Sequence, residues 1–307
     1  MDPQKTFDSI YDDFDRYAAI PAAIVVISLT ILGGNYLLTG EFIDKGLDFT
    51  GGTEVTYSTS GEFNTDEVET IFADQGYQGV NALRLDTQGS NGSQLVVQIP
   101  PPSINNSEQA EEILSTGGYN GSAESFSAIS TAVSGQFFLQ ALLAFALAFT
   151  IMSLVIFAAF KDLAPSTAVI LAAAGDIIVA MAGMVLFNIQ LTLGSFAALL
   201  MLVGYSVDTD IVLSTRTLKR ERGSLRDRMW DSVKTGVTMS SGGIAGFTLL
   251  FIVSYIIVGP SELSNISAVM LFGLIADMPL TWLGNAVILK KYINGDFGNI
   301  EEVIPWK

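Results

Sequence analysis

Four aspartates lie inside long apolar segments, and they are the residues of this chain best suited to chemistry. They are Asp176, Asp208, Asp210 and Asp277, and no Lys or Arg shares a segment with any of them. An ionisable side chain at the centre of a bilayer costs at least about 2.5 kcal/mol, which makes it a candidate for function by default. Acids without bases in such a place indicate a protein that handles cations, most simply protons.

Two missing residue types narrow that chemistry further. The chain has no His, which is the commonest general base, and no Cys, so it forms neither disulfides nor thiolate metal sites. Proton chemistry would therefore fall to the aspartates themselves. The sequence also shows no Gly-rich phosphate loop, no nucleophilic Ser elbow and no metal-ligand cluster. We expect no catalytic residues, no cofactor and no metal.

The segments that hold the aspartates are long enough to cross a membrane as helices. A spanning helix needs roughly 20 mostly apolar residues. Six stretches meet this condition: 18–38, 137–160, 163–187, 191–213, 236–258 and 266–289. The first follows an acidic stretch and is too long for a signal peptide, so we expect a retained anchor.

The positions of the aspartates within the spans suggest different roles. Asp176 and Asp277 fall near mid-span, where desolvation favours a neutral carboxyl that can bind and release a proton. For Asp176 a relay and a helix–helix hydrogen bond both stay open, whereas for Asp277 we favour the hydrogen bond. Asp208 and Asp210 are two residues apart and must point to nearly opposite sides of a helix. We favour Asp208 for function and interpret Asp210 as a satisfied or interfacial carboxylate.

Two other features of the spans concern the helices themselves. Pro279 removes a backbone N–H and should leave a carbonyl one turn earlier in need of a partner. Gly242 and Gly246 form a G-x-x-x-G pattern, which lets helices approach closely.

Charge sets the expected orientation. With a cytoplasmic N-terminus, every basic residue except Lys45 and Arg84 lies on the cytoplasmic side, as the positive-inside rule requires. The chain then divides into a cytoplasmic N-terminal segment 1–16, a first transmembrane helix 17–38, an external domain 39–136, a five-helix transmembrane bundle 137–290 and a cytoplasmic tail 291–307. The net charge of −16 excludes nucleic acid as a partner. Acidity of this kind is typical of a halophilic source, in which salt screens self-repulsion.

The external segment predicts a small α+β domain. Residues 53–58, 82–87, 94–99 and 122–130 alternate as strands do, and helices are expected from Asn64 to about Gly76 and over 107–116. The order is β-α-β-β-α-β, which is typical of a ferredoxin-like domain. The predicted fold class is therefore an α-helical membrane protein of six transmembrane helices with an external ferredoxin-like α+β domain.

Two motifs resemble those of a known family. Directly after the first span the chain reads GLDFTGG (residues 46–52), and the fourth span contains GYSVDTDIV (residues 204–212). Both are similar to signatures of the SecF family, whose members are the smaller partners in the SecD–SecF accessory complex of the protein translocon. The matching residues are Gly46, Asp48, Phe49, Thr50, Gly51, Gly52, Gly204, Tyr205, Ser206 and Arg216. Apart from the resemblance, the residues around Asp48 predict a tight turn in which its carboxylate caps backbone N–H groups.

The resemblance implies a fold and a set of partners. It implies half of an RND-type transporter that works with SecD and the SecY translocon on exported protein chains, with proton flow as a candidate driving force. Membrane lipid surrounds such a protein. Two alternatives are an RND-type small-molecule exporter subunit and an intramembrane aspartyl protease that would use Asp176 and Asp208. The sequence around these two residues does not match the protease motifs, so we expect no enzyme.

Overall fold

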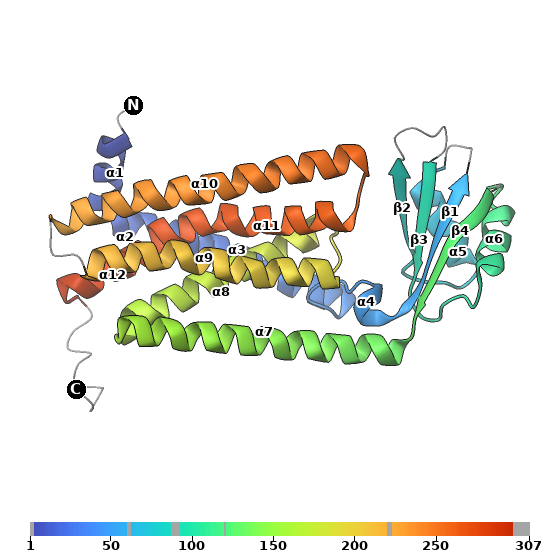
Figure 1. Cartoon of the computed structure of the whole chain (residues 1–307), viewed down its shortest axis with the longest axis horizontal. Coiled ribbons are helices and arrows are strands. Elements are labelled where there is room, and N and C mark those ends of the chain that lie inside the picture. The colour runs from blue at the N-terminus through green and yellow to red at the C-terminus, as the bar shows by residue number, and fades with distance from the viewer. Residues whose placement is uncertain (1–2, 60–62, 87–92, 120, 220–222, 297–307) are drawn as a thin grey trace.

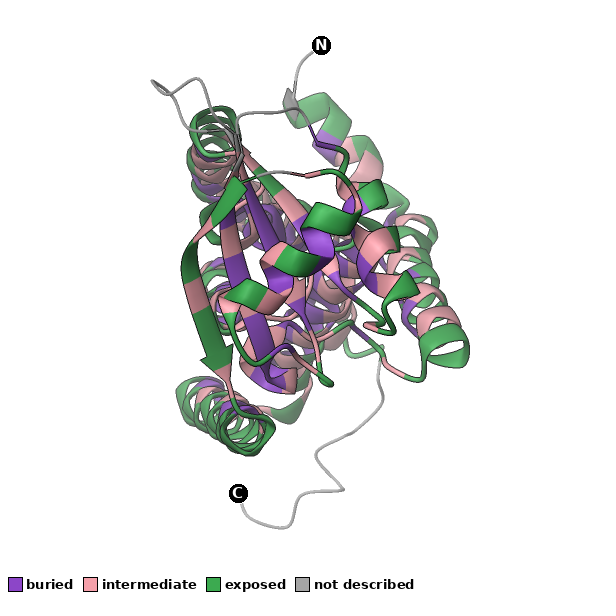
Figure 2. Cartoon of the chain, turned by 90° about the vertical axis from the view of Figure 1, so that its right-hand side faces the viewer, coloured by how far each residue is buried: buried purple, intermediate pink, exposed green. Residues whose placement is uncertain are grey.

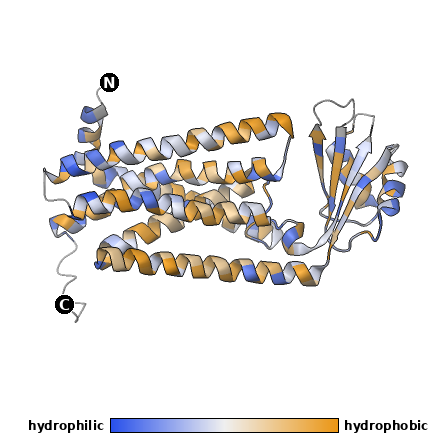
Figure 3. Ribbon diagram, viewed as in Figure 1, coloured by the Kyte–Doolittle hydropathy of each residue, from blue (hydrophilic) through white to orange (hydrophobic). Residues whose placement is uncertain are grey.

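Six helices of the computed structural model are long and apolar enough to cross a membrane, as the sequence predicts (Figure 1). The structure describes residues 3–59, 63–86, 93–119, 121–219 and 223–296. Within them the six candidate spans are Phe14–Thr39, Thr131–Phe160, Leu163–Leu186, Leu193–Lys219, Leu225–Ile257 and Glu262–Asn294. Figure 3 shows hydrophobic residues along these helices and hydrophilic residues gathered at the end of the bundle away from the sheet.

The spans correspond to named helices. They are α2 (Phe14–Tyr17) with α3 (Ala19–Thr39), α7 (Thr131–Phe160), α8 (Leu163–Leu186), α9 (Leu193–Lys219), α10 (Leu225–Ile257), and α11 (Glu262–Pro279) with the π-helix η1 (Leu280–Asn285) and α12 (Ala286–Asn294). A further helix, α1 (Pro3–Asp12), precedes them at the end of the bundle farthest from the sheet (Figure 1). Helix α11 packs against α8, α9 and α10. These contacts place α11 where it can shield polar side chains from lipid.

The basic stretch between the fourth and fifth spans is more helical than the sequence suggested. Helix α9 continues to Lys219, and α10 begins at Leu225 with a reciprocal cap in which Ser224 and Asp227 satisfy each other's backbone N–H groups. Arg220 and Arg222 lie outside the described residues. Helices α9 and α10 therefore extend well beyond the apolar stretches that predicted them.

Pro279 changes the course of the last span. Because a proline has no N–H, it cannot continue the helical hydrogen bonding of α11, and the chain passes directly into η1. A π-helical segment of this kind often marks a functional position in a helix. The turn that follows Pro279 is thus a wider, π-helical one, and it contains Thr281 and Asn285, which contact the buried aspartates.

The domain at the other end of the bundle is a four-stranded antiparallel sheet with two helices. Its elements are β1 (Gly52–Thr59), α5 (Thr65–Asp74), β2 (Asn81–Asp86), β3 (Ser93–Ile99), α6 (Ser107–Thr116) and β4 (Gly121–Ile129). The strand order β2-β3-β1-β4 and the β-α-β-β-α-β sequence confirm the ferredoxin-like prediction. Asn64 caps α5 through Asp66 N, as its sequence position indicated. The predicted strand end at residue 87 lies outside the described residues.

The pleat of this sheet separates two faces. Val55, Tyr57, Leu95, Val97 and Ile99 are buried against α5 and α6 in a continuous core (Figure 2). Neighbouring residues on the same strands point to the opposite face, because successive side chains alternate across a strand. That second face is turned toward the membrane bundle, and on it lie Glu54, Asn81, Leu83, Leu85, Val96 and Gln98.

Candidate functional site

Three of the four aspartates come together in the centre of the bundle. Asp176 on α8, Asp210 on α9 and Asp277 on α11 are each fully buried, with 0% exposure. Within the described part of the chain, none of the three forms a salt bridge, in contrast to Asp12 and Asp15 at the bundle end. Buried charges are normally paired, so this group of carboxyls is suited to holding protons rather than permanent charge.

Hydroxyl groups from neighbouring helices contact two of the carboxyls, those of Asp176 and Asp277. Ser206 on α9 donates to Asp176 Oδ2 at 2.5 Å, and Ser240 on α10 donates to Asp277 Oδ2 at 3.3 Å. Both serines are buried. The contacts tie the carboxyls of α8 and α11 to two other helices, so the protonation of each carboxyl is coupled to helix packing.

Thr281 lies between two carboxyls. Its Oγ1 is 3.0 Å from Asp210 Oδ1 and 3.0 Å from Asp277 Oδ1. A hydroxyl has one hydrogen and can donate to only one acceptor at a time. Both contacts are therefore hydrogen bonds only when one carboxyl is protonated and donates to the hydroxyl oxygen. The arrangement is complete with one proton shared among Asp210, Thr281 and Asp277.

Other polar atoms extend the group toward the end of the bundle that carries α1 and α12. Asn285 donates to Asp210 Oδ1 at 2.7 Å. Asp176 Oδ1, Asp210 Oδ2 and the hydroxyl of Ser214 are buried and have no hydrogen-bond partner within the described residues. Such atoms are unusual in protein interiors. Here they supply open acceptor positions along α8 and α9.

Two arginines lie at the end of what we call the polar line, the buried polar groups from Asp210 past Ser214. Arg228 Nη1 donates to Thr217 O at 2.7 Å, and Arg216 Nη1 donates to Asp231 O and Thr235 Oγ1, each at 2.7 Å. Both arginines join α9 to α10. Arg216, which the sequence motif singled out, thus links these helices and makes no ion pair with a buried aspartate in the described part.

Asp208, which we favoured for function, lies apart from the other three aspartates. It points to the opposite side of α9 from Asp210, as the two-residue spacing predicts, but Asp208 is the exposed member and Asp210 the buried one. Of the two interpretations of Asp210, its burial excludes the interfacial carboxylate, whereas the hydrogen bonds that Oδ1 accepts from Thr281 and Asn285 fit the satisfied one. Asp208 does not join the other three aspartates.

Glycines on both α9 and α10 are left uncovered. Among the described residues, and apart from the backbone of its own helix, a Cβ added to Gly204, Gly242 or Gly246 would meet no atom within 4 Å. The G-x-x-x-G pattern therefore packs against no other described helix, contrary to the simplest expectation for this chain by itself. Tyr205 instead lies against Gly243, where an added Cβ would be 3.1 Å from its ring. Asp208 is thus an exposed carboxyl within a span, and Gly204, Gly242 and Gly246 are left uncovered by the described residues.

The first motif forms a junction between the sheet and the bundle. Asp48 Oδ2 accepts a hydrogen bond from Leu193 N at 2.8 Å, which caps the first turn of α9. Asp48 itself belongs to the one-turn helix α4 (Leu47–Thr50). The expected capping role is thus present, but the capped N–H belongs to a distant helix. The helix that carries Ser206 and Asp210 is in this way tied directly to the chain entering β1.

Two glycines and one aromatic residue complete the junction. Gly51 and Gly52 have φ of 75° and 133°, values that favour glycine. A Cβ on Gly52 would lie 2.3 Å from Ile99 O, so no other residue fits. The ring of Phe49 meets Phe138 of α7 and Phe196 of α9 at centroid distances of 5.5 and 6.2 Å. The motif therefore connects the sheet to two membrane helices.

Sequence reasoning missed three members of the buried group. Ser240, Thr281 and Asn285 are each at most 2% exposed and each contacts one or two of the aspartates. A signal was present, because Asp277, Thr281 and Asn285 recur every four residues and so share one face of a helix. No cluster of His, Cys, Asp or Glu suited to a metal ion occurs in the described ranges.

Comparison with known proteins gives consistent similarities. Residues 109–295 match the family described as protein export membrane protein SecD/SecF, C-terminal. The chain is 37% identical over 288 residues to the protein-export membrane protein SecF of Methanothermobacter thermautotrophicus, covering 93% of this chain and 95% of the relative. It is 36% identical to the SecF protein of Haloferax volcanii, covering 91% of this chain and 94% of that protein.

Solved structures share the fold at low sequence identity. The crystal structure of SecDF, a translocon-associated membrane protein from Thermus thermophilus, superposes with a TM-score of 0.66 at 16% identity over 96% of this chain. A second SecDF structure, in a super-membrane-facing form, gives 0.61 at 17% identity. This chain spans only 39% and 40% of those two chains. It therefore resembles one part of a longer membrane protein.

Proposed function

The chain belongs to the SecF family of protein-export membrane proteins, and from this premise we propose that it is an accessory subunit of the Sec protein translocase. It acts with a SecD-type partner and the SecY channel to promote export of protein chains across the membrane. The relatives are protein-export proteins, so a small-molecule exporter is not favoured. This role requires no catalytic residue in the chain.

The orientation proposed from the sequence places both termini in the cytoplasm and residues 39–136 outside. Support comes from the basic residues, of which all but Lys45 and Arg84 fall on the proposed cytoplasmic side. The polar line from Asp210 past Ser214 then runs toward the cytoplasm, and membrane lipid surrounds the bundle. The acidic composition supports a source with high internal or external salt.

A second six-helix subunit of SecD type would supply what this chain lacks. The matched SecDF chains are more than twice as long as the part that this chain covers. We assign the partner to the face made by Gly204, Asp208, Gly242 and Gly246, because an exposed carboxyl is costly in lipid. In this proposal Asp208 contacts the partner, whereas the buried Asp176, Asp210 and Asp277 serve another purpose.

That purpose is proton coupling. The single observation that supports it is the position of Thr281 between Asp210 and Asp277, which is satisfied by one shared proton. Moving this proton to Asp176 or to the cytoplasmic side leaves contacts between α9, α11 and η1 unmade. A proton passing through the group therefore changes how these helices pack, and Asp48 connects α9 to the external sheet.

Export by reconstituted vesicles tests the proposal. The chain, its SecD-type partner and the SecY channel are placed in vesicles with an imposed proton gradient, and entry of a protease-protected reporter is measured. Asp210→Asn and Asp277→Asn should each remove the stimulation that the gradient gives, while complex assembly stays normal. Asp13→Asn, a change at an exposed site, is the matched control. Unchanged stimulation in both interior variants would refute proton coupling through this group.

A further inference from the structure

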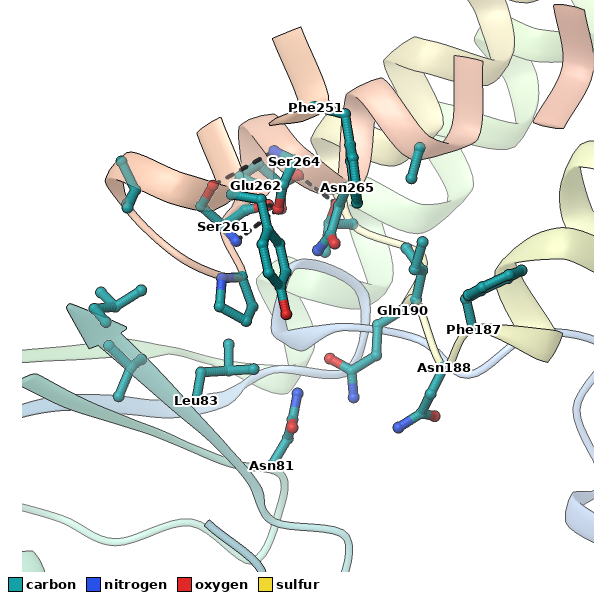
Figure 4. Close-up of a pocket in the computed structure, with 18 of the residues that line it drawn as sticks. Asn81, Leu83, Phe187, Asn188, Gln190, Phe251, Ser261, Glu262, Ser264 and Asn265 are labelled. Atoms are coloured by element: carbon teal, nitrogen blue, oxygen red, sulfur yellow. Dashed lines mark hydrogen bonds between the residues drawn. The ribbon is translucent and has the colours of Figure 1, made fainter. Parts of the chain in front are cut away.

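A groove of about 850 Å³ separates the sheet from the membrane helices (Figure 4). One wall is the sheet face opposite α5 and α6, including Asn81, Leu83 and Gln98. The other wall comes from the α8–α9 connection, the last turns of α10 and the first turns of α11. Its size falls within the range of 300–1,000 Å³ typical of binding pockets. Neither the buried aspartates nor the Asp208 face takes part in it.

The membrane-side wall offers apolar surface. Phe187 stacks on Phe272 with a centroid distance of 5.1 Å, and Phe251 stacks on Tyr255 at 5.7 Å. All four rings line the groove together with Leu271 of α11. Phe187 and Tyr255 remain 67% and 52% exposed. Exposed aromatic surface in a concavity is typical of a site that receives apolar groups.

Side-chain amides line the same groove. Asn81 donates to Gln98 at 3.4 Å and Gln98 donates to Glu54 at 2.8 Å, which forms a polar row across three strands. Opposite this row, Figure 4 shows Gln190 and Asn265 pointing into the space between helices and sheet. Neither of these two side-chain amides has a hydrogen-bond partner within the described residues, and both line the groove.

The chemistry of the walls selects among possible occupants. No Lys or Arg is among the described residues that line the groove, whereas Glu54 and Glu262 are. An anionic lipid headgroup is therefore disfavoured, and a neutral or cationic occupant is favoured. A side-chain amide presents both a donor and an acceptor, as a peptide group does. Amides that face aromatic rings suit a polypeptide in extended form, whose side chains alternate between two faces.

We propose that this groove binds an extended, uncharged or basic segment of the exported chain, with its backbone against the amides and its apolar side chains on the aromatic wall. The inference rests on the proposed export function, since the groove then lies on the side where the chain emerges. The inference specifies which segments of an unfolded exported chain this protein binds. Acidic segments should pass without being retained.

Photo-crosslinking in the assembled complex tests this site. The photoreactive residue benzoylphenylalanine replaces Tyr255 within the groove or, as a control, Leu139 on the exposed face of α7. The export reporter carries a folded domain that stalls it and a segment of alternating Leu and Ser near the exit. Light should join the reporter to position 255 and not to position 139. Replacing each Ser of the segment by Glu should abolish the product.

Amide variants give an independent measurement. Gln190→Leu and Asn265→Leu should each lower the crosslinked fraction roughly fivefold, the effect of losing an ordinary hydrogen bond. Asn105→Leu, at an exposed amide outside the groove, should leave it unchanged.

Failure of this site is distinguishable from failure of the proposed function. A crosslink from position 255 to the SecD-type subunit or to lipid alone, while Asp210→Asn still abolishes gradient-driven export, overturns the groove assignment only. Unchanged gradient stimulation in Asp210→Asn and Asp277→Asn, together with absent reporter crosslinks, counts against both.

Discussion

At the scale of single residues, the hydroxyl of Thr281 has the most demanding position in the bundle. It is fully buried and serves two carboxyls with one hydrogen. A valine has the same shape but cannot hydrogen-bond, so it would leave Asp210 and Asp277 without this contact. The effects of this substitution on stability and on export distinguish a hydroxyl that only stabilises the bundle from one that also takes part in proton movement.

We predict that Thr281→Val lowers the stability of the purified protein by about 1–3 kcal/mol, the cost of leaving a buried polar group unsatisfied. Gradient-stimulated export should fall as well. Thr281→Ser keeps the hydroxyl and should restore export even if a small cavity lowers the Tm. Thermal unfolding in mild detergent and vesicle export measure the two effects. Normal export by Thr281→Val would show that the hydroxyl takes no part in proton movement.

Asp48 gives a second prediction at this scale. Because its carboxylate caps α9 through Leu193 N, Asp48→Ala should cost about 1 kcal/mol, which is typical of a lost helix cap. Asp48→Asn keeps an oxygen acceptor and should cost less. Comparing the Tm of the two variants with that of the unchanged protein tests the assignment. Equal losses in both would indicate that charge matters more than capping.

At the scale of elements, the π-helix η1 connects the proline to the buried group. Pro279 ends the regular hydrogen bonding of α11, and η1 supplies Thr281 while its last residue is Asn285. An interior proline in a helix costs about 3 kcal/mol in soluble proteins. This cost is understandable if the wider turn that follows Pro279 is needed to place the polar side chains of Thr281 and Asn285 in the interior.

We therefore predict that Pro279→Ala raises the Tm but weakens gradient-stimulated export. The alanine restores an N–H that can bond to the carbonyl of Ile275, and a regular helix would shift Thr281 and Asn285 relative to Asp210. Thermal unfolding and vesicle export on the same preparation provide the comparison. A more stable protein with undiminished export would show that the π-helical turn is not required.

At the scale of the whole molecule, the two ends of the bundle differ in chemistry. The sheet domain is acidic, whereas the opposite end gathers basic residues that contact the acids of α1 and α2, as in the ion pairs of Arg226 with Asp12 and Lys291 with Asp15. Lys290 also donates to Tyr11 O and lies over the Tyr11 ring. The first helices are thus fastened to the same end as the last.

Cysteine labelling tests the proposed orientation, because the natural chain has no Cys. An impermeant maleimide applied to intact cells should label Asn105→Cys in the sheet domain and leave Asp296→Cys unlabelled. Both positions are exposed. Permeabilised cells should show labelling of both, which controls for reactivity. The opposite pattern in intact cells would reverse the topology and the direction of the proposed proton path.

The sequence alone determined the elements of this protein. Long apolar runs specify spanning helices because backbone groups in lipid must bond within their own segment, and six were predicted and found. Alternation and turn residues specified the strands in the same local way, and the β-α-β-β-α-β order matched the sheet. Each of these patterns extends over a few consecutive residues, so it predicts an element without knowledge of the helices or strands that pack against it.

Only the tertiary structure decided which acids share a site. The spacing of Asp208 and Asp210 showed that they face opposite ways, but it could not show which side of α9 meets α8 and α11, because both sides are largely apolar. The same limit applies to Asp48, whose partner Leu193 lies far along the chain. Contacts of this kind depend on how whole helices pack together, and periodicity within one helix contains no information about its neighbours.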